Sequence, residues 1–149
     1  MSGIVGWVKW QENPKLESRQ ILKRMMATLV PRGPDGENFW MDEHVALGHT
    51  RLAVIDLEGG HQPMHYVSGD DRWTIIYNGE LYNTEEIRES LKKEGFSFQT
   101  KSDTEVLLKA YVYWGPPCVE RLNGMFAFAV WNKKSHTLFL ARDRLGIKP

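Results

Sequence analysis

The second residue of the chain, Ser2, carries a small hydroxyl directly behind the initiator methionine. Once that methionine is removed, the residue holds both a hydroxyl and a free α-amine, and the amine can accept the hydroxyl proton directly or through a water. This combination is typical of an N-terminal nucleophile. The alternative is that a small second residue is present only because it allows efficient processing of the methionine.

The remaining residues that could do chemistry predict neither a metal site nor an ATP site. The five histidines show no ligand-like spacing with one another or with Cys118, so a metal site is not expected. No GxxxxGK[ST] motif occurs, so ATP binding is not predicted either. Cys118 is the single cysteine, which excludes an internal disulfide and fits a reducing cytoplasm.

The composition limits the kinds of partner that the protein is expected to bind. Nineteen basic residues balance nineteen acidic ones, which gives no global field toward nucleic acid or an anionic membrane surface. The sequence shows no signal peptide pattern and no apolar run of membrane-spanning length. We therefore expect a cytoplasmic protein with one domain over residues 1–149 and neither nucleic acid nor membrane as partner.

Hydrophobic spacing predicts the elements that must position these residues. Helices are expected over residues 16–29, 83–93 and 102–114, and strands over residues 4–8, 37–41, 44–49, 72–77, 125–131 and 137–142. Residues 59–63 are expected to be loop. Mostly hairpin-like connections favour an α+β fold with helices outside the sheets, rather than a doubly wound parallel sheet.

Two helix starts carry the same capping signal. Asn83 with Glu86, and Ser102 with Glu105, have the spacing of a capping box. Gly95 is expected to end the first of these helices.

Five short blocks occur in a fixed order along the chain: SGIVGW at 2–7, RGPDG at 32–36, LGHTRLAVIDL at 47–57, YNGELYN at 77–83 and SDTE at 102–105. With LNGMFAFAVWN and the closing LFLARDRLGIKP, they make nearly the whole chain resemble the N-terminal glutaminase domain of glutamine-dependent asparagine synthetases. Those domains are class II amidotransferases of the N-terminal-nucleophile (Ntn) hydrolase type. The resemblance implies a four-layer αββα sandwich of two antiparallel sheets, with the catalytic N-terminus between the sheets.

The resemblance also implies a reaction. Such a domain hydrolyses glutamine to glutamate and ammonia, and the ammonia travels to a C-terminal synthetase domain that activates aspartate with ATP. No cofactor is implied for this domain, because ATP and Mg belong to the synthetase domain. Glutamine and that synthetase domain are the implied partners.

In the family, a cysteine follows the initiator methionine, where this chain has Ser2. A cysteine thiol has a pKa of about 8.5, and a serine hydroxyl is far less acidic, so we expect the Ser2 form to be severely impaired. Two explanations stay open: a cysteine replaced deliberately to trap glutamine or an intermediate, and a naturally silenced glutaminase.

Roles at the α-carboxylate of glutamine follow from the same resemblance. Arg51 offers a planar fork of donors that suits a carboxylate, although a surface arginine after a strand is the alternative. Backbone groups of Leu52, Val54 and Ile55 are expected to assist. The segment 32–36, with Arg32 and Asp35, is expected to shape the pocket without direct chemistry.

The side-chain carbonyl of glutamine needs hydrogen-bond donors, and its α-ammonium needs acidic groups. The Asn78 amide and the Gly79 N–H are implied as an oxyanion hole, although Asn-Gly is also a common hairpin turn. Glu80 and Asp103 are implied to bind the substrate ammonium, although Asp103 also suits the first turn of a helix. His49 is expected to pack beneath the arginine rather than to transfer protons.

The last block stops within a motif that continues in the family. We therefore expect a fragment that is truncated at the C-terminus, lacks its last strands and the synthetase domain, and exposes an edge over residues 137–142 that favours self-association, as in a homodimer. The alternatives are another class II glutaminase and a catalytically silent domain that binds glutamine or acts as a scaffold.

Overall fold

The computed structural model describes residues 2–9, 16–53 and 58–149, which form two antiparallel sheets. Sheet A has the strand order β1-β3-β2, and sheet B has the order β4-β5-β6-β7. The strands are β1 (Gly3–Val8), β2 (Gly36–Met41), β3 (Val45–Arg51), β4 (Met64–Ser68), β5 (Asp71–Leu81), β6 (Gly124–Asn132) and β7 (Thr137–Arg142).

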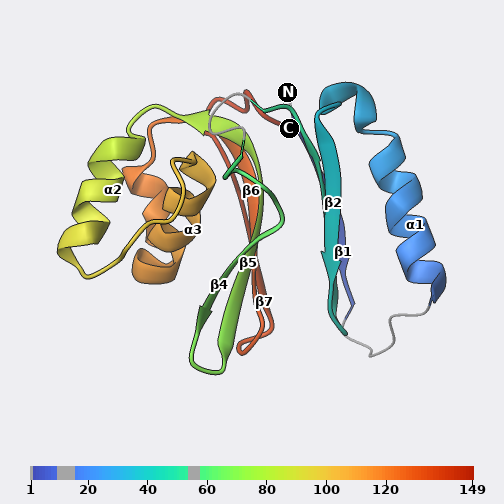
Figure 1. Cartoon of the computed structure of the whole chain (residues 1–149), viewed down its shortest axis with the longest axis horizontal. Helices are drawn as coiled ribbons and strands as arrows, with labels where there is room; N and C mark the ends of the chain where they lie inside the picture. Colours follow the sequence, from blue (N-terminus) through green and yellow to red (C-terminus); the bar gives the residue numbers. More distant parts are fainter. Residues whose placement is uncertain (1, 10–15, 54–57) are drawn as a thin grey trace.

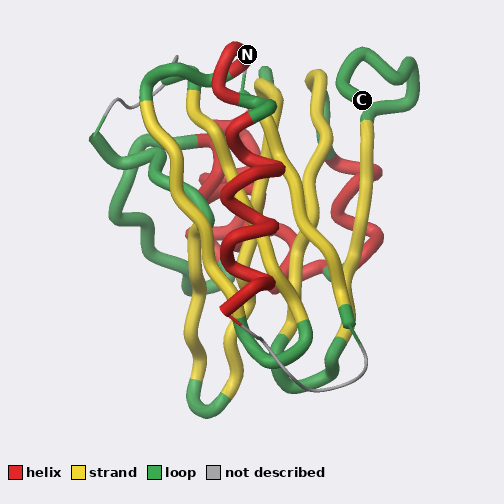
Figure 2. The backbone as a smooth tube through the Cα atoms, turned by 90° about the vertical axis from the view of Figure 1, so that its right-hand side faces the viewer, coloured by secondary structure: helices red, strands yellow, loops and turns green. Residues whose placement is uncertain are grey.

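Helices cover the outer faces of both sheets. They are α1 (Leu16–Ala27), α2 (Thr84–Lys93) and α3 (Asp103–Trp114), with short 3₁₀ turns η1 (Val30–Arg32) and η2 (Pro116–Arg121). Figure 1 shows α1 outside sheet A and both α2 and α3 outside sheet B, with the two sheets facing each other. The tube in Figure 2 shows α1 crossing in front of sheet A. The expected four-layer αββα arrangement is confirmed.

Alternation along β3 explains why two layers can pack on its sheet. Val45 and Leu47 point toward sheet B and pack with Ile76 and Trp131. The intervening Ala46 packs on the other face, against Leu22 and Met26 of α1. Because strand side chains alternate between faces, the odd-numbered residues His49 and Arg51 also face the interior between the sheets.

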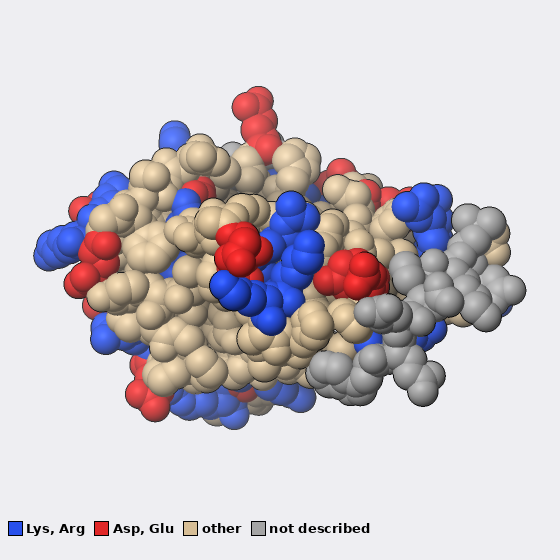
Figure 3. Space-filling model, turned by 90° about the horizontal axis from the view of Figure 1, so that it is seen from below, with Lys and Arg blue, Asp and Glu red and all other residues tan. Residues whose placement is uncertain are grey.

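The two ends of the sandwich differ. At the end where β3 begins, the Trp131 indole N–H donates to Asp42 Oδ2 at 2.8 Å and joins sheet B to the β2–β3 turn. Both chain termini lie at the other end, where β3 finishes (Figure 1). Figure 3 views the face away from the termini, where basic and acidic side chains are intermixed.

Most predicted elements are confirmed, with two corrections. Strand β4 lies in a segment for which the sequence predicted no helix or strand, and β5 continues past Tyr77, its predicted end, to Leu81. Asn78 and Gly79 therefore lie inside a strand, where they pair with Ala127 and Phe126, and are not a hairpin turn. None of the helices that the structure describes is long and apolar enough to cross a membrane.

The two capping signals have different outcomes. The Ser102 hydroxyl accepts a hydrogen bond from the Glu105 backbone N–H at 3.3 Å, as expected of a cap. Asn83 makes no cap with its side chain. Instead it donates to the Arg121 carbonyl at 2.8 Å and accepts from the Asn123 amide at 3.0 Å, which joins the start of α2 to the segment before β6.

Candidate active site

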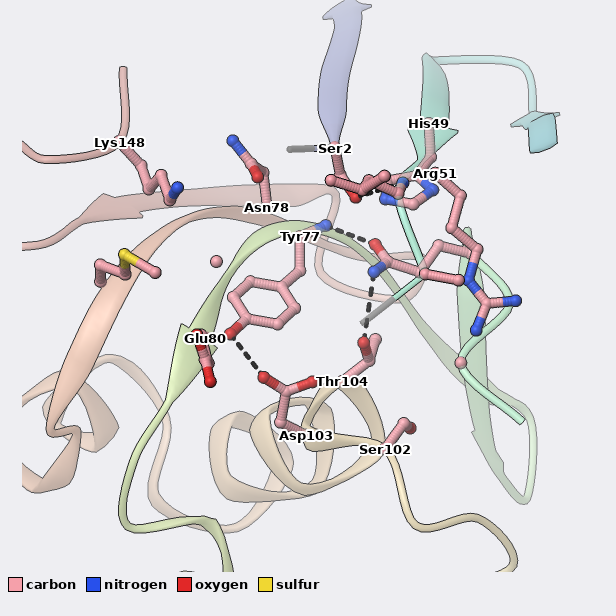
Figure 4. A pocket seen from close by; sticks show the side chains of 16 residues that line it. Ser2, His49, Arg51, Tyr77, Asn78, Glu80, Ser102, Asp103, Thr104 and Lys148 are labelled. Carbon is pink, nitrogen blue, oxygen red and sulfur yellow. Dashed lines mark hydrogen bonds between the residues drawn. The ribbon is translucent and has the colours of Figure 1, made fainter. Parts of the chain in front are cut away.

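A cavity of about 100 Å³ lies at the end of the sandwich where β3 finishes. Its walls come from the residue before β1, the end of β3, the loop before β4, the last part of β5, the start of β6, the first turn of α3 and the loop after β7 (Figure 4). Residues from both sheets and from a helix layer thus reach one site.

Ser2 forms part of the cavity wall. Its hydroxyl oxygen accepts a hydrogen bond from the Leu52 backbone N–H at 3.1 Å. Its carbonyl oxygen accepts one from the Arg32 Nε–H at 3.3 Å. These two contacts fix the first described residue against the end of β3, with its hydroxyl directed into the site (Figure 4).

The segment after η1 braces the same end of β3. The Asp35 backbone N–H donates to the Arg51 carbonyl at 2.8 Å, and its carboxylate accepts from the Ala53 N–H at 2.9 Å. A Cβ on Gly33 would lie 2.4 Å from the Thr50 carbonyl carbon, so only glycine allows this approach. The sequence block RGPDG therefore orders the pocket rim, without itself lining the cavity.

Arg51 is the last residue of β3 and lines the cavity. Its Nη1 lies 3.5 Å from His61 Nδ1, and Leu52 beside it also lines the cavity. Of the backbone groups expected to assist Arg51, Val54 and Ile55 lie outside the described residues.

His49 is 2% exposed and lines the cavity from β3. Burial lowers its pKa to about 4, with a further lowering from the positive charge of Arg51 and an opposing effect from a hydrogen bond with the Tyr77 backbone. The ring is therefore neutral at pH 7, and its Nε2 has no hydrogen-bond partner among the described residues. The expectation that it lies beneath Arg51 agrees with this buried position.

Asn78 and Gly79 line the cavity from the middle of β5. A Cβ on Gly79 would lie 2.2 Å from the Met125 carbonyl oxygen and 2.8 Å from Phe126 Cα. The two strands approach too closely there for any side chain. Asn78 and Gly79 thus lie next to each other in the cavity wall, where the strand carries no side chain after the Asn78 amide.

Asp103 begins α3 and faces inward. Its Oδ2 accepts hydrogen bonds from the Tyr77 hydroxyl at 2.8 Å and from the Leu81 N–H at 3.2 Å. Burial raises the pKa of Asp103, and these hydrogen bonds oppose that rise. Burial, with the nearby Asp103 charge, raises the pKa of Tyr77 well above its ordinary value. Glu80 also lines the cavity and is half-buried.

A residue that the sequence did not single out connects these walls. Gln62 Oε1 accepts a hydrogen bond from the Tyr77 N–H at 2.6 Å, and its Nε2 donates to the Thr104 hydroxyl at 3.2 Å. Gln62, which also lines the cavity, therefore ties β5 to α3. Met125 and Lys148 also line the cavity and were not predicted.

Among residues 2–9, 16–53 and 58–149, no group of three or more His, Cys, Asp or Glu side chains is arranged to hold a metal ion. The described residues that line the cavity instead carry hydroxyl and amide groups, an imidazole, a guanidinium, an ammonium and two carboxyl groups. Such a set suits a zwitterionic ligand with a polar side chain.

A sandwich of this kind, with residue 2 in a cavity between its sheets, is the architecture of a glutamine amidotransferase domain. The whole chain, residues 1–149, matches the glutamine amidotransferase domain family, and the chain belongs to that family. The resemblance seen in the sequence blocks is confirmed.

Two curated relatives are asparagine synthetases. The chain is 54% identical over 149 residues to "Asparagine synthetase [glutamine-hydrolyzing] 3" and 47% identical over 150 residues to "Asparagine synthetase [glutamine-hydrolyzing] 1", both of Bacillus subtilis (strain 168). The alignments cover 100% of this chain but 24% and 23% of those proteins. The chain thus spans about a quarter of the length of the curated relatives it matches.

A solved structure shares the fold. "Glutamine phosphoribosylpyrophosphate (PRPP) amidotransferase from B. subtilis complexed with ADP and GMP" superimposes with a TM-score of 0.60 and 27% sequence identity. The match covers 73% of this chain and 25% of that chain.

Proposed function

We propose that the cavity binds glutamine and that residue 2 is the nucleophile that attacks its side-chain amide. The observation that carries this proposal is that the Ser2 hydroxyl lies in one cavity with Arg51, Asn78 and Asp103. A guanidinium at one wall suits the α-carboxylate, and acidic groups at another suit the α-ammonium.

The reaction proceeds in two steps. Residue 2 gives its side-chain proton to its own α-amine, and its side-chain atom bonds to the amide carbon of glutamine. The oxyanion that forms is stabilised by the Asn78 amide and the Gly79 N–H. The C–N bond then breaks, and ammonia leaves with the transferred proton. Water hydrolyses the resulting acyl-enzyme to glutamate and restores the free nucleophile.

Serine at position 2 makes this chemistry slow. The Ser2 hydroxyl accepts a hydrogen bond from the Leu52 N–H, which holds it in position. As a hydroxyl it is only weakly acidic, so it gives up its proton far less readily than a thiol. We propose that Ser2 occupies the position that cysteine holds in active members of the family. Ammonia would then pass to an ATP-dependent synthetase domain that makes asparagine, as the names of the two curated relatives suggest.

A second candidate function is a domain that binds glutamine without hydrolysing it. Ser2 favours this candidate, because every other proposed pocket group among the described residues could still bind the amino acid. The two candidates differ only in turnover.

The test compares glutamate release from glutamine by the unmodified protein, Ser2→Cys and Ser2→Ala. We expect Ser2→Cys to exceed the unmodified protein by about 10²-fold or more, because a thiol with a pKa near 8.5 ionises far more readily than a hydroxyl. Mass spectrometry must show that the methionine is removed in all three. Glutamine binding measured by calorimetry without turnover in any variant would leave the binding function and overturn the hydrolase.

A further inference from the structure

Lys148 is a buried cation in the cavity wall, and the sequence assigned it no role although the closing block LFLARDRLGIKP contains it. Its exposed fraction is 2%, and it lines the same cavity as Ser2 and Asn78. Lysine is almost never fully buried unless its charge has a use or a counter-charge. It lies in the loop that follows β7.

The backbone of this loop is what fixes the lysine. The Asp143 carboxylate accepts hydrogen bonds from the Lys148 N–H at 3.0 Å, the Ile147 N–H at 2.7 Å and the Phe126 N–H at 3.3 Å. Gly146 has a positive φ of 65° and allows the turn between them. These bonds are made by main-chain N–H groups, and they hold the loop that carries Lys148 against β6.

Burial and nearby charges both act on the pKa of the Lys148 ammonium. Burial and then the charge of Arg32 lower its pKa, while the charges of Asp143 and Glu80 oppose this lowering. Arg32 is the residue that donates to the Ser2 carbonyl. Lys148 and Ser2 line the same cavity.

The two cations of the cavity lie at opposite sides. In Figure 4, Arg51 lies on one side of the close-up and Lys148 on the other, with Ser2 and Asn78 between them. If Arg51 binds the α-carboxylate of an amino acid, Lys148 lies toward the end of its side chain. The donors already assigned to that end, on Asn78 and Gly79, are neutral.

We propose that Lys148 recognises negative charge at the side-chain end of the bound ligand. This inference rests on the glutamine site proposed above. In the reaction the charge is the oxyanion, and in the product it is the second carboxylate of glutamate. A buried cation interacts strongly with such a charge because little water is present to screen it. Lys148 thus favours the charged state over neutral glutamine.

The test measures how well the protein distinguishes glutamate from glutamine. Calorimetry gives the Kd of each ligand for the unmodified Ser2 protein, Lys148→Met and Lys148→Gln, with Lys133→Met at the exposed β6–β7 turn as the matched control. Both ligands carry the same α-groups, so their ratio isolates the side-chain end. We expect the Lys148 substitutions to weaken glutamate binding about tenfold more than glutamine binding, and the control substitution to change neither affinity.

The outcomes separate this inference from the function on which it rests. A parallel loss of both ligands, or unchanged affinity for both, in a variant that keeps the circular dichroism spectrum of the parent would overturn the role of Lys148 while leaving a glutamine site. Failure of the unmodified protein to bind either ligand would overturn the glutamine site and the inference with it.

Discussion

Burial changes the chemistry of single side chains around the cavity. His49 stays neutral because its charged form is poorly solvated between the sheets, and Asp103 is harder to ionise for the same reason. The Tyr77 hydroxyl partly compensates Asp103 by donating to its carboxylate. These effects belong to individual residues, and each one has a consequence for stability.

His49 makes stability depend on pH in a defined window. Its pKa is about 4 in the folded protein, against about 6.5 for an unperturbed histidine, so the unfolded chain takes up the proton first as pH falls. The stability that neutral His49 allows is complete above pH 6.5 and is lost progressively as pH falls to about 4. Between pH 7 and pH 5 this loss is about 2 kcal/mol.

The matching variant is His49→Gln, which does not titrate and can still donate to the Tyr77 backbone. Urea unfolding of parent and variant at pH 7 and pH 5 gives the difference, in which the contributions of other titrating groups cancel. We expect the parent to lose about 2 kcal/mol more than the variant over this interval. An equal loss in both proteins would contradict the assignment.

The sequence predicted those site residues that lie in short ordered blocks. Arg51, Asn78, Glu80 and Asp103 all line the cavity, as the blocks that contain them implied. Gln62 was assigned only to a loop, because nothing local shows that its amide bonds two distant elements.

Lys148 was missed for a related physical reason. A lysine near the end of the printed chain is usually exposed, and its burial depends on the hydrogen bonds that Asp143 makes to the loop. Such tertiary bonds have no periodicity or spacing in the sequence that would predict them.

At the scale of elements, the close approach of β5 and β6 sets the shape of the site. Gly79 faces the Met125 carbonyl, and Gly124 faces the Glu80 carbonyl. A Cβ added to either glycine would lie 2.2 Å from the facing carbonyl oxygen, so neither position has room for a side chain. This reciprocal contact brings the two strands together where the proposed oxyanion donors lie.

Two glycine-to-alanine substitutions, one at this contact and one away from it, test the steric argument. Gly79→Ala adds a Cβ against fixed backbone, so we expect it to lower the free energy of unfolding by about 3 kcal/mol. Gly36→Ala is the matched control, because Gly36 is also in a strand but has nothing within 4 Å of the added Cβ. We expect that variant to stay within about 0.5 kcal/mol of the parent. Equal urea midpoints for the two variants would refute the steric argument.

Element prediction succeeded where local signals act alone. The helices and most strands follow from apolar spacing, since their buried faces are formed by the residues that carry the pattern. β4 (Met64–Ser68) was missed because it is an edge strand with mixed exposure, and its position depends on pairing with β5. Asn83 had the same signal as Ser102, but its side chain bonds a distant segment instead.

At the scale of the molecule, the cavity joins layers that would otherwise separate on unfolding. Sheet A contributes Arg51, sheet B contributes Asn78, and the helix layer contributes Asp103. A ligand that contacts all three binds the folded state only, so its binding must raise the melting temperature.

Thermal unfolding in glutamine measures this coupling. At a concentration of about 100 times the Kd, glutamine should add about 2.7 kcal/mol of stability, which is a rise of roughly 5 to 10 °C. Arg51→Met should abolish the rise, because the α-carboxylate loses its guanidinium. Arg24→Met, on the exposed side of α1, should keep it. A full rise in Arg51→Met would contradict the proposed role of this arginine.

The hydrogen bond between Trp131 and Asp42 joins the sheets at the end away from the cavity. Trp131 is 0% exposed, and water would reach its indole ring only if the sheets moved apart. Indole emission shifts to longer wavelength on contact with water, so the difference spectrum between the parent and Trp131→Phe reports the spacing of the sheets. The Trp131 ring lies at the end of the sandwich away from the proposed ligand site. Its fluorescence can therefore report the separation of the sheets without direct contact with a bound molecule.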